Sequence, residues 1–306
     1  MNMSIKNNVK DEAKGHIAAI VTVFVWGTAF IATRLLLADF VPLEIIFFRF
    51  CIGIVALMIA HPRILRIKSI KEELMFAAAG LCGVSLYFLF ENIALMHTAA
   101  SNVGVIVSVS PFFTALFATW LLEGEKPRSS FYIGFAAAMA GIFLISFNGI
   151  TVLELSPIGD VLAVLAALVW GVYSILLKKI SRFGYSTVQT TRRIFCYGLI
   201  ILIPALFLFP FEFGIERFLR PTNMFNILFL GLGASALCFA SWNYSVRALG
   251  AVKTSIYIYL IPVITVVASV IVLDERVTWM LVAGTVLTLV GLAVSSKPLY
   301  IPANKR

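Results

Sequence analysis

Two charged residues, Arg49 and Glu91, lie within long apolar stretches of the sequence. A charge near the centre of a bilayer costs at least about 2.5–3.5 kcal/mol, so each of them needs a partner or a function. At about 1.5 Å per helical residue, both lie roughly 10 Å below the same membrane surface. Two interpretations stay open: Glu91 binds a cation, a substrate amine or a proton, or it forms a static ion pair with Arg49 that holds helices together. Arg34 is a third such charge, and Glu44 is its expected partner.

Aromatic and amide side chains within the same stretches are further candidates for substrate contact. Glu91-Asn92 in the first half of the chain corresponds to Trp242-Asn243 in the second, so a carboxylate stands on one side only. This asymmetry suits a cavity that recognises a polar, asymmetric molecule, although drift after duplication explains it too. The candidates for binding a substrate or coupling its transport are Glu91, Arg49, Asn92, Trp26, Trp170, Tyr173, Trp242, Asn243 and Tyr257.

Pro111 and Pro262 are predicted to form a hinge or a kink in two of the apolar segments. Proline lacks a backbone N–H and leaves the carbonyl four residues earlier without its helical partner, here that of Val107 and of Ile258. Freed backbone is tolerated at membrane depth where it lines a cavity or finds another partner. The alternative for both prolines is a rigid kink that serves packing alone.

The sequence contains no motif for covalent or metal chemistry. His16, His61 and His97 are scattered at the ends of segments, and the four cysteines lie inside apolar runs without the spacing of a metal or disulfide framework. No nucleophile is paired with a base. The protein is therefore predicted not to be an enzyme and to use no cofactor and no metal.

The elements that must position these residues are membrane-spanning helices. Apolar residues make up 61% of the 306-residue chain and charged residues 13%, whereas soluble domains have about half and a quarter. The apolar runs have the length of about 20 residues that a membrane-spanning helix needs. The sequence thus predicts an all-α integral membrane protein with ten spans, at 16–37, 42–60, 74–97, 102–122, 130–147, 158–178, 190–209, 225–247, 254–273 and 277–295.

The distribution of Lys and Arg predicts how the spans are oriented. Nearly all basic residues outside the ten spans fall on the side of the N-terminus, and the opposite side holds only Arg217, Arg220 and Arg276. The positive-inside rule then places both termini in the cytoplasm. The net charge of +9 is accordingly a topology signal, and no nucleic-acid partner is predicted.

The two halves of the chain repeat one another. Trp26-Gly27 matches Trp170-Gly171 at an offset of 144 residues, and Asn92 matches Asn243 at an offset of 151, as Pro111 matches Pro262. Because each half holds five spans, the second half must enter the membrane inverted relative to the first. The predicted segments are a cytoplasmic N-terminal segment at 1–14, a five-helix repeat at 15–147, a linker at 148–157, a second five-helix repeat at 158–295 and a cytoplasmic tail at 296–306.

Four glycines complete the repeat. Gly134 and Gly141 of the fifth predicted span match Gly284 and Gly291 of the tenth at an offset of 150. In each span the two glycines are seven residues apart and share one helical face. Small residues on one face allow membrane helices to approach closely, so these positions are predicted to serve helix packing.

The duplicated pattern resembles the EamA-type carriers of the drug/metabolite transporter superfamily. The resemblance rests on the two Trp-Gly pairs, on the glycines of the fifth and tenth spans, and on the stretch IALMHTAASNVGVIVSVSPFFTALFATWLLEGEKP with its echo YSVRALGAVKTSIYIYLIPVITVVASVIVLDERV. It covers residues from about 15 to 295. Such a resemblance implies ten helices, alternating access and a central cavity lined by both halves.

The residues and the resemblance together predict a secondary-active transporter of small polar metabolites, which include amino acids, amines and drug-like compounds. We expect an exporter or exchanger in the cytoplasmic (inner) membrane, a monomer or a homodimer, whose partners are its small-molecule substrate and the lipid bilayer. Proton coupling stays open. The alternative is a membrane-embedded enzyme or a scaffold protein without transport activity.

Overall fold

The computed structural model describes residues 2–98, 100–123, 127–146, 156–208, 211–264, 267 and 279–296 of the chain. These residues are almost entirely helical and contain no strand. Among them, seven helices are long and apolar enough to cross a membrane: Asp11–Leu36, Pro42–Ala60, Ile70–His97, Val103–Leu121, Pro157–Ser181, Thr187–Phe207 and Pro221–Leu249.

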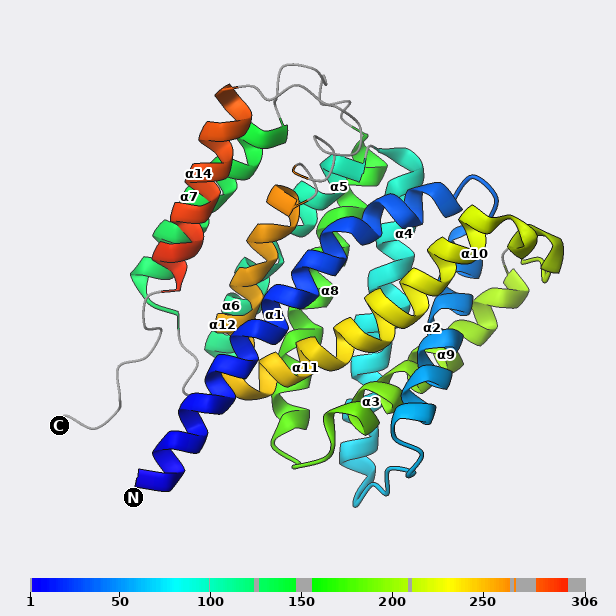
Figure 1. Ribbon diagram of the computed structural model, residues 1–306, viewed down its shortest axis with the longest axis horizontal. Coiled ribbons are helices and arrows are strands. Elements are labelled where there is room, and N and C mark those ends of the chain that lie inside the picture. Colours follow the sequence, from blue (N-terminus) through cyan, green and yellow to red (C-terminus); the bar gives the residue numbers. More distant parts are fainter. Residues whose placement is uncertain are drawn as a thin grey trace.

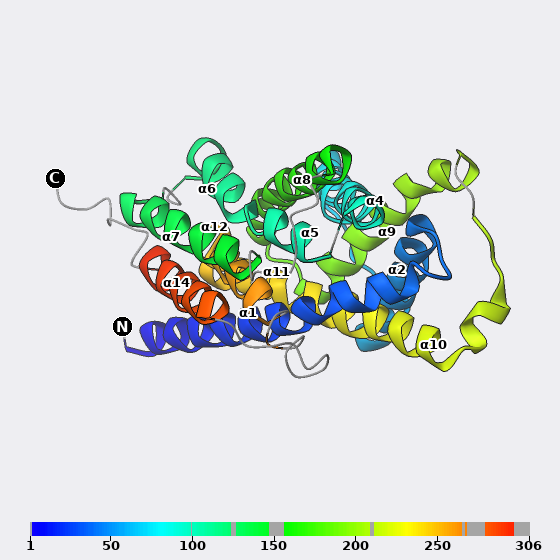
Figure 2. The same ribbon diagram turned by 90° about the horizontal axis from the view of Figure 1, so that it is seen from above.

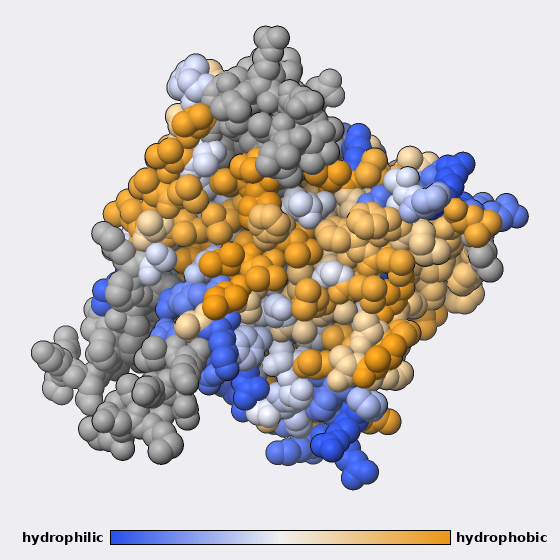
Figure 3. Space-filling view, viewed as in Figure 1, coloured by the Kyte–Doolittle hydropathy of each residue, from blue (hydrophilic) through white to orange (hydrophobic). Residues whose placement is uncertain are grey.

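Three shorter apolar helices accompany these seven. They are Ser129–Leu144, Ala251–Ile264 and Val282–Ser295, and they lie where the sequence predicts the fifth, ninth and tenth spans. Figure 3 shows apolar side chains over the middle of one face, with hydrophilic side chains gathered along its lower and right-hand margins. The prediction of an all-helical membrane protein is confirmed, and the count of ten spans stays a prediction.

Figure 1 shows the helices of both halves. In the first half the first, second and fifth predicted spans are regular α-helices, whereas the third contains a π-helical segment and the fourth loses regular helical geometry just before Pro111. The elements of this half are α1 (Asn2–Leu36), α2 (Pro42–Ala60), α3 (Ile70–Gly80), the π-helix η1 (Leu81–Leu86), α4 (Tyr87–His97), α5 (Ala100–Val107), α6 (Ser110–Leu121) and α7 (Ser129–Ser146).

The second half is divided at corresponding places. Its elements are α8 (Pro157–Ser181), α9 (Thr187–Leu208), the 3₁₀-helix η2 (Ile215–Leu219), α10 (Pro221–Leu228), the π-helix η3 (Phe229–Leu237), α11 (Cys238–Leu249), α12 (Ala251–Ser255), the 3₁₀-helix η4 (Ile256–Tyr259) and α14 (Trp279–Ser295).

Local sequence explains where several helices begin. Pro42, Pro157 and Pro221 occupy the first turn of α2, α8 and α10, where the N–H that proline lacks would have no helical partner. The Ser156 hydroxyl accepts the backbone N–H of Gly159 and caps α8. Between α11 and α12 the backbone of Gly250 has a φ of +94°, which favours glycine, so the chain can turn sharply there.

Helical geometry is interrupted just before Pro111 and just before Pro262. In the first half, α5 ends at Val107 and α6 begins at Ser110, with Pro111 in its first turn. In the second half, α12 gives way to the tight turn of η4 before Pro262. Each proline removes a backbone donor, so the helix cannot continue with regular hydrogen bonds through this point.

The two π-helices also stand at repeat-related places, in the third and eighth predicted spans. A π-helix holds one residue more per turn and is frequent at functional sites. In this protein η1 carries Gly83, against which the ring of Tyr173 lies. Similarly, η3 carries Ser235, whose hydroxyl accepts a hydrogen bond from Nε of Arg49. Both irregular segments therefore position buried side chains of the interior.

Contacts between the halves recur in pairs at repeat-related positions. Gly27 of α1 lies against Ile264, and its counterpart Gly171 of α8 lies against Phe113, which matches Ile264 at the offset of 151. A methyl group at Gly27 would be 2.8 Å from Ile264, and one at Gly171 would be 2.9 Å from Phe113. Glycine at each place lets the first span of one half approach the fourth span of the other.

The fifth and tenth predicted spans, α7 and α14, pack side by side (Figures 1 and 2). A methyl group at Gly141 would be 2.6 Å from the Gly284 carbonyl oxygen, and one at Gly134 would be 2.5 Å from the Gly291 carbonyl oxygen. Real side-chain carbons do not approach backbone atoms so closely. The prediction that these four glycines serve close helix packing is confirmed.

We expect Gly141→Ala to destabilise the protein by about 1–3 kcal/mol, because the added carbon can be accommodated only if α7 and α14 separate. The midpoint of thermal unfolding in detergent measures the effect. Gly104→Ala is the matched control, since a methyl group there would have no neighbour within 4 Å. It should leave stability unchanged or raise it, because alanine is the better helix former. Equal unfolding midpoints for Gly141→Ala and the wild type would contradict the packing account.

Candidate functional site

A cavity lies in the interior where helices of both halves meet. Its empty volume, including the open space at its mouth, is about 510 Å³. Its walls come from α1, α2, α4, α8 and α11 and from the interrupted segments near both prolines. The residues that line it are Trp26, Ala29, Phe30, Thr33, Arg49, Tyr87, Phe88, Glu91, Val107, Ser110, Trp170, Phe239, Ile258 and Ile261.

Arg49 of α2 reaches this cavity although only 3% of the residue is exposed. Its Nε donates a hydrogen bond of 3.0 Å to the Ser235 hydroxyl, and its guanidinium carbon lies 4.3 Å from the centre of the Phe88 ring. The ring face attracts the cation and fixes its plane. No other hydrogen bond joins Arg49 to the part of the chain that the structure describes. Its terminal nitrogens are therefore available to a ligand.

Glu91 of α4 lines the same cavity one helical turn after Phe88 and is 6% exposed. Its Oε2 is buried and has no hydrogen-bond partner among the described residues. No ion pair joins Glu91 to Arg49 within those residues, so the static pair is not formed in this structure. A buried carboxylate without a direct hydrogen-bond or ion-pair partner is costly. It fits a site that a cation completes.

Two further polar atoms of the cavity lining have no partner among the described residues. They are the Ser110 hydroxyl and the Trp170 indole N–H, and both are buried. Buried polar groups are almost always hydrogen-bonded, so each such group requires an explanation. The repeat-related Trp26 differs, since its indole N–H donates to the Ala234 carbonyl at 2.9 Å. The cavity therefore combines an unpaired acceptor with several unpaired donors.

The remaining wall of the cavity is aromatic. The rings of Trp26 and Trp170 meet edge to face with centroids 5.3 Å apart, and the ring of Tyr87 lies 4.8 Å from that of Trp170. Phe239 contacts both tryptophans. Val107 and Ile258, the residues whose carbonyls the two prolines were predicted to free, also line the cavity. The interrupted helices thus border the cavity in both halves.

Four of the nine candidate residues from the sequence line this cavity: Glu91, Arg49, Trp26 and Trp170. Asn92 instead donates to the Pro42 carbonyl at 3.3 Å and ties α4 to the start of α2. The Tyr257 hydroxyl is 2.5 Å from Nδ1 of His16, so it joins α1 to η4.

The other three candidates are buried next to the cavity. Trp242 is fully buried, and its ring centroid lies 5.1 Å from that of Trp26. Tyr173 donates to the Asn243 side-chain carbonyl at 3.1 Å. Tyr173 and Asn243 are both buried and do not line the cavity. The Tyr173 ring contacts the cavity residues Trp170 and Phe239, with ring centroids 5.0 and 6.1 Å away.

Several lining residues escaped the sequence reasoning. Phe30 and Thr33 follow Trp26 on one face of α1 at helical spacing, and Phe88 precedes Glu91 by one turn. Spacing from the known candidates could have found these three. Phe239 and Ser110 gave no such signal, because their place depends on how α11 and α6 pack.

The expected pairing of Arg34 with Glu44 is wrong. Arg34 donates to the Leu95 carbonyl at 2.6 Å and ties α1 to the end of α4. Glu44 instead forms an ion pair of 2.8 Å with Arg217. That partner lies in η2, far along the chain, so nothing in the local sequence pointed to it.

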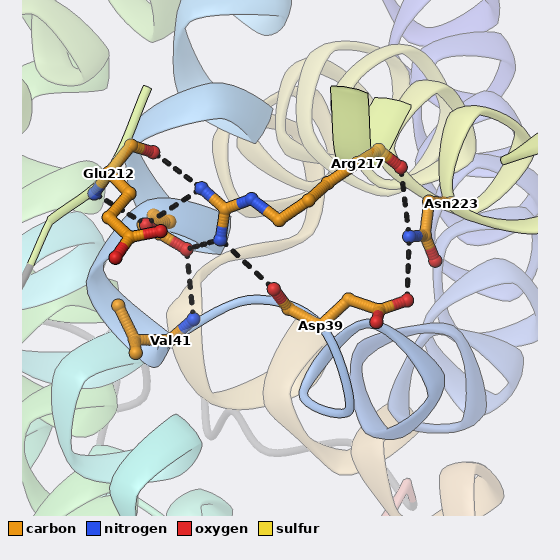
Figure 4. Close-up of polar contacts among 6 residues, drawn as sticks. Asp39, Val41, Glu212, Arg217 and Asn223 are labelled. Atoms are coloured by element: carbon orange, nitrogen blue, oxygen red, sulfur yellow. Dashed lines mark hydrogen bonds and ion pairs between the residues drawn. The ribbon is translucent and has the colours of Figure 1, made fainter. Parts of the chain in front are cut away.

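A polar cluster joins the α1–α2 turn to the segment around η2, and Figure 4 shows its members Asp39, Val41, Glu212, Arg217 and Asn223. Glu44 lies at its centre. Both terminal nitrogens of Arg217 bond to the Glu44 carboxylate, at 2.8 and 3.0 Å. The backbone N–H groups of Val41 and Glu212 donate to the same carboxylate, at 3.0 and 2.7 Å. The Glu44 side chain raises the pKa of Arg217. We call Glu44 with Arg217 and the backbone of Val41 and Glu212 the outer clasp.

Asp39 extends this cluster at the surface. Its carboxylate accepts hydrogen bonds from Asn223 at 2.8 Å and from Arg220 at 2.6 Å. These two bonds hold the pKa of Asp39 below its usual range. The cluster thus links the first half of the chain to the second at the end of the molecule where few basic residues lie.

Arg193 occupies the position in the second half that Arg49 occupies in the first. It forms an ion pair with Glu73, whose carboxylate also accepts a hydrogen bond from the Tyr197 hydroxyl. The pair is partly exposed and lies outside the cavity. The two repeat-related arginines therefore have different surroundings: Arg49 lines the cavity and Arg193 does not.

Comparison with known proteins places this architecture in a family. The model of the EamA-like transporter family matches the chain twice, at residues 13–147 and 157–297. An uncharacterized transporter of Archaeoglobus fulgidus is 27% identical over 93% of this chain and 98% of its own. A probable terminal-alkyne amino-acid exporter of Streptantibioticus cattleyicolor is 27% identical over 92% of both chains. A solved crystal structure with 19% identity shares the fold, with a TM-score of 0.72 over 93% of this chain and 98% of its own.

The family and the apolar helices identify a multi-pass membrane protein of a transporter family. The two family matches together cover nearly the whole chain, so the chain belongs to the EamA-like transporter family.

Proposed function

We propose that this transporter carries a small zwitterionic metabolite, an α-amino acid with an apolar side chain, through the cavity that holds Glu91 and Arg49. The observation that carries this proposal is the pair of opposite charges that line one apolar cavity without pairing with each other. Each charge is costly inside a membrane. A ligand that brings one ammonium and one carboxylate would satisfy both.

The available atoms suit such a ligand. Glu91 Oε2 lacks a partner and can accept from an ammonium group. The terminal nitrogens of Arg49 can donate to a carboxylate in the two-pronged geometry that guanidinium favours. The unpaired Ser110 hydroxyl and Trp170 N–H supply two more donors at the same wall. The aromatic rings then favour an apolar side chain over a charged one.

One relative supports this substrate class. The Streptantibioticus cattleyicolor protein, which matches along nearly its full length, is named as a probable amino-acid exporter. We extend that activity to this chain as a proposal: export or exchange of amino acids across the cytoplasmic (inner) membrane, with Glu91 also able to carry a coupling proton. The membrane-embedded enzyme and the scaffold protein without transport remain the alternatives, and no observation favours either.

We further propose that ten spans form two inverted five-helix repeats that alternate access to the cavity, with both termini in the cytoplasm. The paired contacts of Gly27 with Ile264 and of Gly171 with Phe113 support a two-fold relation between the halves. The strong bias of Lys and Arg toward one side supports the orientation.

Cysteine labelling in intact cells tests this orientation. In a cysteine-free protein, the single cysteine of Ser4→Cys should not react with a membrane-impermeant maleimide added outside the cells. Arg217 is not used as a labelling position on the opposite side, because it belongs to the outer clasp. Leu219→Cys is the matched control on the opposite side, since Leu219 is exposed next to the clasp. We expect labelling of Leu219→Cys only. Labelling of Ser4→Cys from outside would contradict the ten-span topology.

Binding of matched ligands to the purified protein tests the substrate class. Leucine and phenylalanine should raise the midpoint of thermal unfolding in proportion to the logarithm of saturation. Their methyl esters lack the carboxylate and their deaminated analogues lack the ammonium, so each should shift the midpoint much less at equal concentration. Equal shifts by the amino acid and both analogues would show that the two charges are not recognised.

A further inference from the structure

A hydrogen-bonded layer separates the cavity from a second, smaller pocket. Tyr173 of α8 donates to the Asn243 carbonyl of α11 at 3.1 Å, and the Asn243 amide donates to the Thr191 hydroxyl of α9 at 2.8 Å. The Thr191 hydroxyl donates in turn to the Thr187 carbonyl at 2.8 Å. Tyr173, Asn243 and Thr191 are all buried. The chain of bonds therefore crosses three helices without a gap.

The second pocket begins on the far side of this layer. It has an empty volume of about 250 Å³, open space included, and its polar lining residues are Ser181, Tyr185, Thr187, Thr190, Asn243 and Arg247. Arg247 is exposed, so the pocket reaches the surface of the protein. Hydroxyl groups and one cation at the mouth suit a small polar molecule that carries a carboxylate.

The residues follow one another in register along two neighbouring helices. On α8 the cavity residue Trp170 is followed by Tyr173 of the layer. About two helical turns after Tyr173, the same helix reaches Ser181 of the second pocket. On α11 the cavity residue Phe239 is followed after one turn by Asn243, which belongs to the layer and also lines the second pocket. Because a helix rises about 1.5 Å per residue, the layer is only about one side chain thick.

The layer has no equivalent in the other half. Tyr173 matches Ala29 at the offset of 144, and Ala29 lines the cavity. Thr191 matches Phe47 at the same offset, and Asn92, the counterpart of Asn243, bonds to a backbone carbonyl. The small side chain of Ala29 thus leaves open space in the first half, whereas the large ring of Tyr173 fills the corresponding space in the second half. This difference explains why one side of the interior is hollow and the other is closed.

We propose that the second pocket is the cytoplasmic vestibule of the transport route and that the Tyr173–Asn243–Thr191 layer is the gate between it and the cavity. This inference rests on the proposed transport function and topology. The vestibule lies where α8 and α11 end, and the last turns of these helices carry Lys178, Lys179 and Arg247. The positive-inside rule assigns this side to the cytoplasm. The gate opens when the Tyr173–Asn243 bond breaks and the ring moves away from Gly83.

Accessibility of single cysteines from the cytoplasmic side tests the gate. In a protein whose native cysteines are replaced, Ser181→Cys reports on the vestibule and Ala29→Cys reports on the cavity. With an impermeant maleimide added to inside-out vesicles, Ser181→Cys should label fast and Ala29→Cys slowly. Adding Tyr173→Phe, which keeps the ring and removes the donor, should raise the labelling rate of Ala29→Cys about fivefold, the effect of one lost hydrogen bond.

A second gate variant and a control keep the test decisive. Thr191→Val preserves the volume and removes the acceptor of the Asn243 amide, so it should also raise the Ala29→Cys rate. Ser174→Ala is the control, because among the described residues the Ser174 hydroxyl bonds only within α8, to the Trp170 carbonyl at 3.0 Å. It should leave the rate unchanged. Equal Ala29→Cys rates with and without both gate variants would overturn the gate.

Labelling of Ser181→Cys only from outside would overturn the vestibule. Because labelling needs no substrate, these outcomes are independent of amino-acid binding. Failure of every amino acid to bind would refute the proposed substrate and leave the gate result standing.

Discussion

A folded Glu91→Gln protein should lose accumulation of substrate driven by a pH gradient while it still exchanges substrate at saturating concentration. The substitution keeps the shape of the side chain and removes its charge, so the residue can no longer hold a proton or pair with an ammonium group. A hydrogen bond to a charged group contributes about 1.5–3 kcal/mol. The apparent affinity for a zwitterion should therefore fall about 10- to 100-fold, as measured by uptake into proteoliposomes.

Glu73→Gln is the matched control, because Glu73 pairs with Arg193 at the position that repeats Arg49 yet lies outside the cavity. It should transport nearly as well as the wild type. The double variant Arg49→Gln/Glu91→Gln separates function from structure. If the two residues were only structural partners, it would be more stable than either single variant. Full pH-driven transport by well-folded Glu91→Gln would eliminate the coupling role.

Glu44→Ala should destabilise the protein by about 3–5 kcal/mol, the cost of removing one partner of a buried ion pair. Glu44 is 1% exposed, and its loss would remove the ion-pair partner of Arg217 and the acceptor of the backbone N–H groups of Val41 and Glu212. The outer clasp joins the two halves of the chain, so its loss should lower the midpoint of thermal unfolding in detergent.

Glu12→Ala provides the comparison for this prediction. Glu12 is paired with Lys253 at 2.9 Å, but its side chain is 52% exposed. Exposed pairs contribute about 0–1 kcal/mol, so the midpoint should move little. The reverse order of effects, with Glu12→Ala more damaging than Glu44→Ala, would show that the clasp does not hold the halves together.

The sequence predicted the elements of the fold well because their signals are local. Apolar runs, helix-starting prolines such as Pro42 and the spaced glycines of α7 and α14 each act within a few turns of the chain. Charge placement pointed to Glu91 and Arg49 for the same reason, since any charge in an apolar run requires an explanation. The internal repeat then brought Trp26 and Trp170 together, and the structure places their rings in contact.

The remainder depended on packing between distant segments. Arg217 follows Glu44 by 173 residues, and the sequence alone favoured a pair between Glu44 and the nearer Arg34. The difference between Ala29 and Tyr173 was visible as a mismatch in the repeat, yet only the three-dimensional arrangement assigns one to the cavity and the other to the closed layer. The internal repeat predicts which backbone segments correspond in the two halves. Positions where the residue type differs between the halves, such as Ala29 and Tyr173, mark side chains that differ in role.

Counterflow in proteoliposomes tests the central claim most directly. Vesicles that contain the purified protein are loaded with unlabelled leucine or phenylalanine and diluted into a trace of the same amino acid in labelled form. We predict transient uptake of label that saturates with concentration, disappears in protein-free vesicles and is strongly reduced by Arg49→Gln. A well-folded protein that gives no uptake with any apolar amino acid, or a flux that rises linearly without saturation, would contradict transport of a zwitterion through this cavity.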